Sequence, residues 1–407
     1  MDRLTLALFL VSYALLAVGG LPPFRFDRTG IAIMGAAAML LTGAIPLDAA
    51  VEAVDYRTLI FLFGMMIVVA NLRLAGFFRL VTAGAVARAR SPRQLLAVTV
   101  FVPGILAAFF INDVVCLVCT PLVLQVAHRL RLPPTPYLLA LATAANIGSA
   151  ATISGNPQNM LVASFARVPY ADFALHLAPL AAAGLVVDYA ILRLLFRREL
   201  YGHLTVPATD LLERRVHKPL LYKSSFAALL TVSLFFAGYP VAEVSLGVAA
   251  WLLATRRVRP EKIYREIDWP LLVLFIGLFV IVGAVEHAGI DRRVLSAVAS
   301  IHHWGVAALL AATAALSNLV SNVPAVMLLK PAVVQATDPT RTAMLVAAAS
   351  TFAGNLLTIG SVANLIVLEQ ARRAGIAISF WQYARVGIPV TLATLTLTVL
   401  TFAYVYR

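Results

Sequence analysis

Residues 110–121 read FINDVVCLVCTP, and this stretch decides the fold because its pattern occurs twice in the chain. The apolar run is interrupted at Asn112 and ends at Pro121. Residues 321–331, SNVPAVMLLKP, are interrupted at Asn322 and end at Pro331, an offset of 210 residues from the first pair. The chain is therefore expected to consist of two related halves.

A second interrupted run follows the first one in each half. Residues 145–159 read ANIGSAATISGNPQN, and Gly155 and Asn159 recur as Gly360 and Asn364 at an offset of 205 residues. Gly and Pro free backbone groups that must find partners inside a bilayer, from a neighbouring helix, water, a substrate or an ion. Interrupted hydrophobic segments at corresponding positions in two halves are typical of secondary transporters, where they point to the binding site.

The composition indicates a membrane protein. Of the 407 residues, 61% are hydrophobic and 13% are charged, whereas soluble domains have about half and about a quarter. Apolar runs near 20 residues match the thickness of the hydrocarbon core, so a lipid bilayer is the expected surrounding. The net charge of +13 lies mostly in segments between the apolar runs, which favours a signal for membrane orientation over a nucleic-acid site.

We expect ten membrane-spanning helices, five in each half. They cover residues 4–20, 29–45, 58–72, 136–163, 172–196, 219–238, 241–256, 269–286, 341–368 and 383–406. Two further stretches, 94–127 and 303–335, have a polar turn between arms of about 15 residues. Because roughly 20 residues are needed to cross, re-entrant hairpins are expected there, with full double spans as the alternative.

The distribution of basic residues predicts how these helices are oriented. The segments after the odd-numbered helices, together with those flanking the first hairpin, hold 24 Lys and Arg residues. The opposite side holds 7, and Lys330 lies inside the second hairpin. The richer side is expected to be cytoplasmic, which places both termini outside the cytoplasm. Five helices per half is an odd number, so the two halves must face opposite ways.

The predicted fold is an all-α polytopic membrane protein of two inverted repeats, each with five transmembrane helices, a re-entrant hairpin and a broken helix. The N-terminal repeat, residues 1–205, contains the hairpin 94–127 and the broken helix 136–163. The C-terminal repeat, residues 206–407, contains the hairpin 303–335 and the broken helix 341–368. The hairpin tips would then meet near the middle of the membrane, a geometry suited to alternating access.

The two hairpin tips are candidates for binding an anion. Asn112 and Asn322 each lie where a hairpin turns and a new helix begins. Asn is a good N-cap, and a helix start presents free N–H groups and the positive end of the helix dipole. Two facing helix starts would form a pocket for an anion or a polar oxy-species. The alternative is that each Asn only caps a turn.

Asp113 is the candidate for ion coupling. It is the only carboxylate in either predicted hairpin, and the second half has Val323 at the equivalent position. Intramembrane carboxylates often act as proton carriers. The alternative is a structural Asp that accepts hydrogen bonds from the N–H groups of the hairpin helix.

Several other residues are weaker candidates. Those at the helix breaks are Thr152, Ser154, Gly155, Thr358 and Gly360. Lys330 could attract anions from outside or stabilise the end of its helix. Cys116 and Cys119 could bind a thiophilic metalloid or could be small apolar residues, and this choice stays open. We find no metal-ligand set, cofactor motif, nucleotide loop or nucleophile–base pair, so no enzyme activity is predicted.

Residues 110–121 and 145–159 resemble the arsenite-permease branch of the ion transporter superfamily. That superfamily also includes divalent-anion:sodium symporters, D-type sodium/proton antiporters and silicic acid efflux carriers. The resemblance covers essentially the whole chain. It implies a transport domain of hairpins and broken helices that moves like an elevator against a scaffold. Because relatives include dimers, a homodimer stays an open alternative to a monomer.

The resemblance also assigns residues to the site. Asn112, Asp113, Asn156 and Asn159 match the first half of the family's binding site, and Ser321, Asn322, Ser361 and Asn364 match the second half. Sodium symporters of the superfamily have Ser-Asn-Thr at both tips, whereas this chain has Ile-Asn-Asp at 111–113 and Ser-Asn-Val at 321–323. This departure disfavours sodium coupling and di- or tricarboxylate substrates, and Asp113 fits proton coupling instead.

The sequence therefore predicts a secondary transporter in a prokaryotic inner membrane. Arsenite or antimonite efflux in exchange for protons is the leading hypothesis, with Asp113 carrying the proton. One alternative is a sodium-coupled symporter of a dicarboxylate, sulfate or phosphate, or a sodium/proton antiporter. A gated anion channel is the alternative from another functional class.

Overall fold

The computed structural model describes residues 2–18, 27–202, 217–254, 258–289 and 305–406, and the regular elements in these ranges are all helical. The first half contains α1 (Asp2–Val18), α2 (Arg28–Leu41), α3 (Leu47–Ala53), α4 (Tyr56–Ala75), α5 (Phe77–Val86), α6 (Pro92–Phe109), α7 (Asn112–Arg129), α8 (Thr135–Ser149), η1 (Ile153–Gly155), α9 (Pro157–Ala166) and α10 (Tyr170–Leu195). The predicted boundary between the repeats, at residues 205 and 206, lies outside the described residues.

The second half contains a matching series of helices. These are α11 (Lys218–Phe236), α12 (Val241–Leu253), α13 (Pro260–Tyr264), α14 (Trp269–His287), α16 (Val306–Val320), α17 (Asn322–Val334), α18 (Pro339–Ala353), η2 (Thr358–Gly360), α19 (Val362–Arg373), α20 (Phe380–Leu400) and the π-helical turn η3 (Thr401–Val405). The predicted helix–break–helix pattern is therefore present in both halves.

Among the described residues, six helical segments are long and apolar enough to cross a membrane: α4, α6, α10, α11, α14 and α20 with η3. Most of the other predicted spans are shorter apolar helices or are divided at the breaks. The arms of the first hairpin were expected to have about 15 residues, but α6 and α7 have 18 each. The reason for α6 is that Ser91 caps it and Pro92 starts it, so Pro92 and Arg93 lengthen the helix beyond the predicted start at residue 94. Re-entrance of the hairpins stays a prediction.

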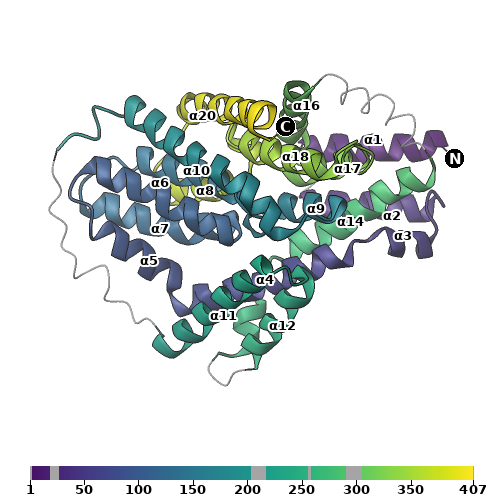
Figure 1. Cartoon of the computed structure of the whole chain (residues 1–407), viewed down its shortest axis with the longest axis horizontal. Helices are drawn as coiled ribbons and strands as arrows, with labels where there is room; N and C mark the ends of the chain where they lie inside the picture. Colours follow the sequence, from purple (N-terminus) through teal and green to yellow (C-terminus); the bar gives the residue numbers. More distant parts are fainter. Residues whose placement is uncertain (1, 19–26, 203–216, 255–257, 290–304, 407) are drawn as a thin grey trace.

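Helices of each half pack against helices of the other half, and the same pair of positions is in contact both ways. The second long helix of each half packs on the third of the other, as α2 on α14 and α12 on α4. The broken helix of each half packs against the hairpin of the other half: α9 packs on α17, and α19 packs on α7. In Figure 1, α4, α11 and α12 lie along the lower part of the molecule, and α18, α17 and α20 lie along the upper part. Two interleaved, related halves would make such contacts, and their opposite orientation in the membrane stays a prediction.

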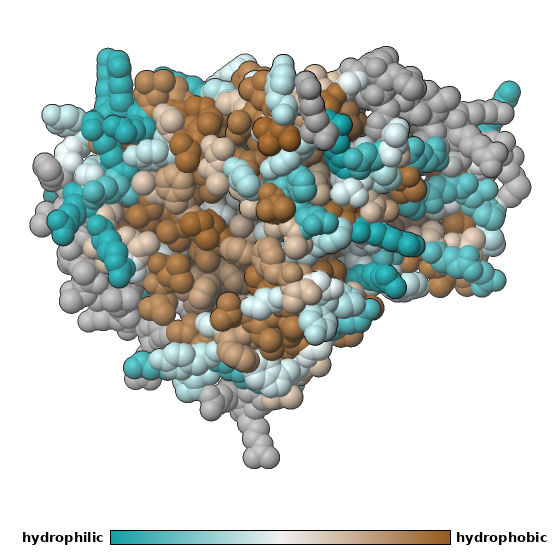
Figure 2. Space-filling model, in the orientation of Figure 1, coloured by the Kyte–Doolittle hydropathy of each residue, from teal (hydrophilic) through white to brown (hydrophobic). Residues whose placement is uncertain are grey.

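The surface is strongly apolar. Figure 2 shows hydrophobic side chains in a broad band down the middle of one face, with hydrophilic side chains gathered towards its left and right sides. Large exposed apolar residues include Leu41, Leu175, Leu194, Leu229 and Trp381. A soluble monomer rarely exposes a continuous apolar area of this size, whereas lipid chains would cover it in a bilayer. The chain is a multi-pass membrane protein.

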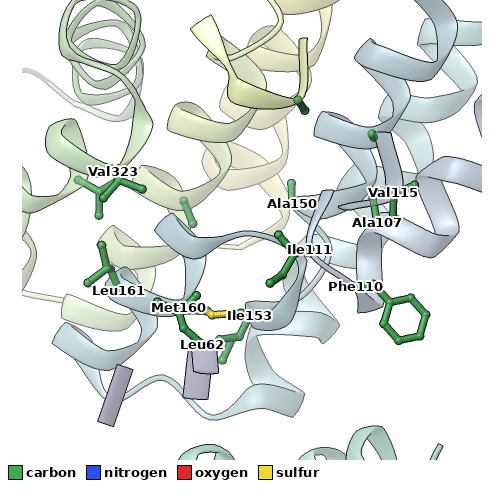
Figure 3. Close-up of a cluster of buried hydrophobic side chains, with 14 of the residues drawn as sticks. Leu62, Ala107, Phe110, Ile111, Val115, Ala150, Ile153, Met160, Leu161 and Val323 are labelled. Atoms are coloured by element: carbon green, nitrogen blue, oxygen red, sulfur yellow. The ribbon is translucent and has the colours of Figure 1, made fainter. Parts of the chain in front are cut away.

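The helix breaks are held inside an apolar shell. Ile111, Ile153, Met160 and Val323, from the first hairpin, the first break, α9 and the second hairpin, belong to one cluster of buried hydrophobic side chains (Figure 3). Polar groups at the breaks must therefore find partners within the protein.

Candidate functional site

Each break interrupts a buried helix and restarts it with a side-chain cap. In the first half, α8 ends at Ser149, and Asn156 caps α9 by accepting a hydrogen bond from the Asn159 backbone N–H at 2.8 Å. In the second half, Ser361 caps α19 by accepting from the Ala363 N–H at 3.3 Å. Asn156 and Ser361 are 205 residues apart, so the cap occurs at the same place in both halves.

The carbonyl groups freed by the two breaks are satisfied in the same way. The Asn159 Nδ2 donates to the carbonyl oxygens of Ser149 and Thr152 at 3.0 and 2.9 Å. The Asn364 Nδ2 donates to the two carbonyls 205 residues later, at 2.7 and 3.2 Å. These two asparagines therefore stabilise the non-helical backbone at the breaks. This is a structural role, whereas the sequence predicted a role in substrate binding.

Asn146 is the centre of a group that we call the amide cluster, formed by Asn112, Asn146, Asn355, Ser361 and Asn364. The Asn146 Oδ1 accepts from Asn112 Nδ2 at 3.0 Å and from Ser361 Oγ at 2.9 Å. Its Nδ2 donates to the Oδ1 atoms of Asn355 at 2.9 Å and Asn364 at 3.0 Å. All five side chains are buried. The cluster thus joins the first hairpin tip to both broken helices.

A second cluster surrounds Thr351 and consists of Ser149, Asn156, Gln158, Asn159 and Thr351. Thr351 Oγ1 donates to Asn159 Oδ1 at 3.3 Å and accepts from Asn156 Nδ2 at 3.2 Å. Thr351 lies 205 residues after Asn146, the centre of the amide cluster. Its partners Asn156 and Asn159 are the equivalents of Ser361 and Asn364, again at an offset of 205 residues. The two clusters are therefore related by the repeat, with each centre bonded to the broken helix of the other half.

Sequence reasoning missed Asn146, Thr351 and Asn355 as site residues. Asn146 and Thr351 are equivalent positions that are polar in both halves, so a full comparison of the repeats would have found them. Asn355 has Ala150 as its equivalent. A search for repeated polar residues passes over it, and no local signal marks it.

The two hairpin tips differ from the expected caps. Asn112 and Asn322 are the first helical residues, and the cap positions are Ile111 and Ser321, neither of which makes a side-chain capping bond. The prediction that the asparagines are N-caps is therefore wrong. A residue inside the helix directs its side chain outward, so Asn112 can enter the amide cluster. Asn322 instead accepts from Ser317 Oγ at 2.5 Å, within its own hairpin.

The second tip carries a basic contact that sequence reasoning did not predict. The Arg28 guanidinium donates to Ser321 Oγ at 3.1 Å. Ser321 has a φ angle of +76°, which a residue with a side chain rarely adopts. Such backbone strain is often found at ligand-binding and switch positions. Arg28 entered the sequence analysis only as one of the charges that orient the chain.

Asp113 lies outside both clusters. It is half-buried on the first turn of α7 and lines a cavity of about 40 Å³ with Arg73, Glu266 and Asp268. Arg73 and Glu266 form an ion pair at 2.5 Å in this cavity. Within the described part of the chain, Asp113 makes no hydrogen bond or ion pair. Its neighbour Asn112 reaches the amide cluster, so the two residues connect the cluster to this cavity.

The weaker candidates occupy different places. Thr152 Oγ1 donates to the Ala108 carbonyl, and Ser154 Oγ lies 2.8 Å from the Tyr170 hydroxyl, so both tie the first break to its surroundings. Lys330 forms an ion pair with Glu286 at 2.9 Å, away from the clusters.

Thr358 makes no side-chain hydrogen bond to a described residue. The glycines at the breaks leave no room for a side chain. A Cβ on Gly155 would lie 2.2 Å from the Ser149 carbonyl oxygen, and one on Gly360 would lie 2.9 Å from Asn318 Oδ1.

The two cysteines are fully buried and unpaired. The Cys119 sulfur lies 3.7 Å from Thr82 Oγ1 on α5. Over the described ranges, no group of three or more His, Cys, Asp or Glu side chains is arranged to hold a metal ion.

A larger cavity of about 400 Å³ opens near the first break. Its lining includes Arg57, Ser164, Arg167, Tyr170 and Glu243, and also Ile153 of η1. The distribution of basic residues predicts that the segments around residues 57, 167 and 239 lie on the non-cytoplasmic side. The cavity is thus a candidate entrance to the site from that side.

Comparisons with known proteins agree with this architecture. A family model described as a citrate transporter (CitMHS) matches residues 13–340. An uncharacterized transporter of Mycobacterium tuberculosis is 31% identical, with 98% of this chain and 97% of that protein covered. The silicon efflux transporter LSI3 of Oryza sativa subsp. japonica is 30% identical, with 94% of each chain covered. The crystal structure of the YdaH transporter of Alcanivorax borkumensis has a TM-score of 0.56 at 14% identity, covering 100% of this chain and 98% of that one.

Proposed function

This chain belongs to the citrate transporter family of membrane transporters, and from this membership we propose that it is a secondary active transporter of a small inorganic anion or oxyacid. Arsenite or antimonite, exported in exchange for protons, is the proposed substrate. The observation that carries the proposal is the meeting of both helix breaks in two buried clusters of amide and hydroxyl groups.

The chemistry of the clusters supports a weakly charged oxyacid. Their ten side chains are Asn, Gln, Ser or Thr, and none carries a charge. An amide both donates and accepts hydrogen bonds, as the hydroxyl groups of an undissociated oxyacid do. Multiply charged carboxylates are more often bound by Arg, which forms paired, charge-assisted hydrogen bonds. In this proposal Asn112, Asn156, Asn159, Ser361 and Asn364 exchange some of their mutual bonds for bonds to substrate.

The second tip completes the proposed site. Ser321 and Asn322 would approach the clusters during the transport cycle, and Arg28 would bring a positive charge with Ser321. The proposed cycle is an elevator movement, in which the hairpins and broken helices shift together against a scaffold of other helices. The 400 Å³ cavity beside the first break supports access from one side.

The membrane placement is also part of the proposal. The excess of Lys and Arg on one side supports an inner-membrane protein whose termini lie outside the cytoplasm. A homodimer is retained as a proposal on the family resemblance alone.

We propose that Asp113 carries the coupling proton. Its support is geometric, since the carboxylate lines a cavity shared with Arg73, Glu266 and Asp268 while the adjacent Asn112 bonds into the amide cluster. Protonation would change the charge of this cavity next to the site and so link proton binding to hairpin position.

The test is arsenite flux in proteoliposomes with Asp113→Asn. This variant should lose accumulation driven by a proton gradient and keep downhill arsenite exchange. Asp172→Asn is the matched control, because Asp172 is exposed on the first turn of α10, and it should behave as wild type. Full proton-driven accumulation by Asp113→Asn would remove Asp113 from the coupling mechanism.

The description of the matching family as a citrate transporter favours a carboxylate substrate, and we therefore keep a sodium-coupled carboxylate symporter as the second candidate. Citrate uptake that depends on a sodium gradient and not on a proton gradient would establish it in place of the first.

A further inference from the structure

Asp188 is a buried carboxylate that the proposed function does not use. It lies in the middle of α10, and its side chain is 0% exposed. Thr143 Oγ1 of α8 lies 3.0 Å from Asp188 Oδ2. Arg193, the nearest basic residue along the helix, is exposed and makes no ion pair with it within the described residues. An isolated charge in such a place would be very unfavourable.

The hydrogen bonds around Asp188 indicate that the carboxyl group carries a proton. Thr143 Oγ1 has one hydrogen but lies 3.0 Å from both Asp188 Oδ2 and the Leu139 carbonyl oxygen. If the carboxyl group is protonated, it donates to Thr143, and Thr143 donates to Leu139, so both contacts are hydrogen bonds. If it is ionised, one of the two contacts joins two acceptors without a hydrogen between them.

A neighbouring hydroxyl is available for the ionised form. Asp188 Oδ1 and the Tyr383 hydroxyl are both buried, and neither has a hydrogen-bond partner among the described residues. Tyr383 lies on α20, which packs against α10, and it is close enough to Asp188 to interact with its charge. A relative movement of these two helices that brought the two groups within hydrogen-bond distance would let the Tyr383 hydroxyl donate to the ionised carboxylate.

Asp188 is also connected to the amide cluster. The Asn355 Nδ2 donates to the backbone carbonyl of Thr143 at 3.3 Å, and the Asn355 Oδ1 accepts from Asn146 at 2.9 Å. The segment at Asn355 is tightly packed on α20, because a Cβ on Gly387 would lie 2.2 Å from the Asn355 carbonyl oxygen. A change in the charge of Asp188 that moved α20 would therefore displace Asn355, which belongs to the amide cluster.

Few other titratable groups act on Asp188. On its own helix the neighbour is Tyr189, and on α20 they are Tyr383 and Arg385. The other long helices packed against α10 carry titratable groups only near their starts: Tyr137 on α8, Arg93 on α6, Arg341 on α18, and Lys218, Tyr222 and Lys223 on α11. Cys116 of α7 is close enough to Tyr383 to interact with it.

We propose that Asp188 is a second proton-binding group of the transporter. Its carboxyl group is protonated in the conformation described here, and the proton leaves to water when the Tyr383 and Thr143 hydroxyl groups donate to the carboxylate that remains. The proposal rests on the proposed transport function for its role in coupling. Its protonation state does not depend on the identity of the substrate.

Infrared spectroscopy of the purified protein tests the protonation state without any substrate. At pH 7 the wild type should give a C=O stretching band of a protonated, buried carboxylic acid, and Asp188→Asn should lack it. Asp113→Asn identifies any part of the band that comes from Asp113. Absence of the band in wild type, or its full retention in Asp188→Asn, would overturn the proposal.

A second variant keeps the test decisive if Asp188→Asn does not fold. Tyr383→Phe removes a donor that would serve only the ionised carboxylate, so the band should persist to a higher pH than in wild type. Thr143→Val removes a hydrogen-bond partner of both forms of Asp188 and should shift the frequency of the C=O band, because that frequency depends on hydrogen bonding. An unchanged titration in Tyr383→Phe together with an unchanged band in Thr143→Val would contradict the proposed roles of these hydroxyl groups.

Flux measurements test the coupling role separately. In proteoliposomes, Asp188→Asn should lose most of the proton-driven arsenite accumulation while downhill exchange continues. Unchanged accumulation would make Asp188 a structural group only. If wild type moves no arsenite with a proton gradient, the proposed function fails, and the infrared result still decides whether Asp188 binds a proton.

Discussion

At the scale of single residues, the candidate site is built from neutral amides that hold one another. Asn146 uses both atoms of its amide group and makes four side-chain hydrogen bonds, to Asn112, Asn355, Ser361 and Asn364. Because these partners come from the first hairpin and the second broken helix, one side chain links parts that an elevator movement would shift together. A substrate with donors and acceptors could replace part of this network without leaving a buried charge unpaired.

We predict that Asn146→Leu strongly destabilises the protein and abolishes transport. The substitution removes one hydrogen bond from each of four buried partners, and a buried polar atom left without a partner typically costs about 1–3 kcal/mol. The thermal unfolding midpoint in detergent measures the effect. Asn71→Leu is the matched control, because Asn71 is equally buried but, among the described residues, its Nδ2 bonds only to the Ile67 carbonyl of its own helix. Equal losses in the two variants would show that the network has no special role.

At the scale of elements, the repeat made the broken helices predictable. Gly155 and Asn159 with their equivalents predicted both breaks, and η1 and η2 lie at those places, 205 residues apart. The hairpin tips were less predictable, because an N-cap and the first helical residue are only one position apart, and a sequence pattern does not fix a helix boundary to one residue. The position of Asp113 away from the amide cluster follows from that one-residue shift, and a sequence pattern does not resolve it.

We predict that the close approach of α6 and α8 depends on Gly148. A Cβ at this position would lie 2.0 Å from the Gly104 carbonyl oxygen, so Gly148→Ala must separate the helices. Overpacking of this kind costs about 1–3 kcal/mol or more. Gly247→Ala is the control, because a Cβ there meets no atom within 4 Å, and a helical Gly→Ala change gains about 1 kcal/mol. A thermal midpoint for Gly148→Ala at or above that of wild type would contradict this packing.

At the scale of the whole molecule, composition predicted a helical membrane protein, and the apolar surface and the family membership confirm it. The orientation of the helices in the membrane and the identity of the substrate do not follow from composition. In the part of the chain that the structure describes, six helical segments reach spanning length by themselves, so the ten-helix arrangement requires broken and short helices to cross in combination. The proposed role of Asp188 could not be predicted from the sequence either, since it depends on Thr143 and Tyr383, which come from distant parts of the chain.

We predict that residue 172 faces the outside and residue 90 faces the cytoplasm. Asp172→Cys and Arg90→Cys place one new thiol at each exposed position, while the native Cys116 and Cys119 are fully buried. A membrane-impermeant maleimide applied to intact cells should label only the first variant, and permeabilised cells should give labelling of both. The reverse pattern would invert the predicted topology.

The central claim is proton-driven transport of a small oxyacid. The most direct measurement is flux into proteoliposomes that contain the wild-type protein, with arsenite, antimonite, phosphate, sulfate, silicate and citrate compared under an imposed proton gradient and an imposed sodium gradient. We predict uphill movement of arsenite or antimonite with the proton gradient alone. Sodium-driven uptake of citrate, with no proton-driven movement of an oxyacid, would contradict the claim and assign the amide clusters to a sodium-coupled carboxylate site.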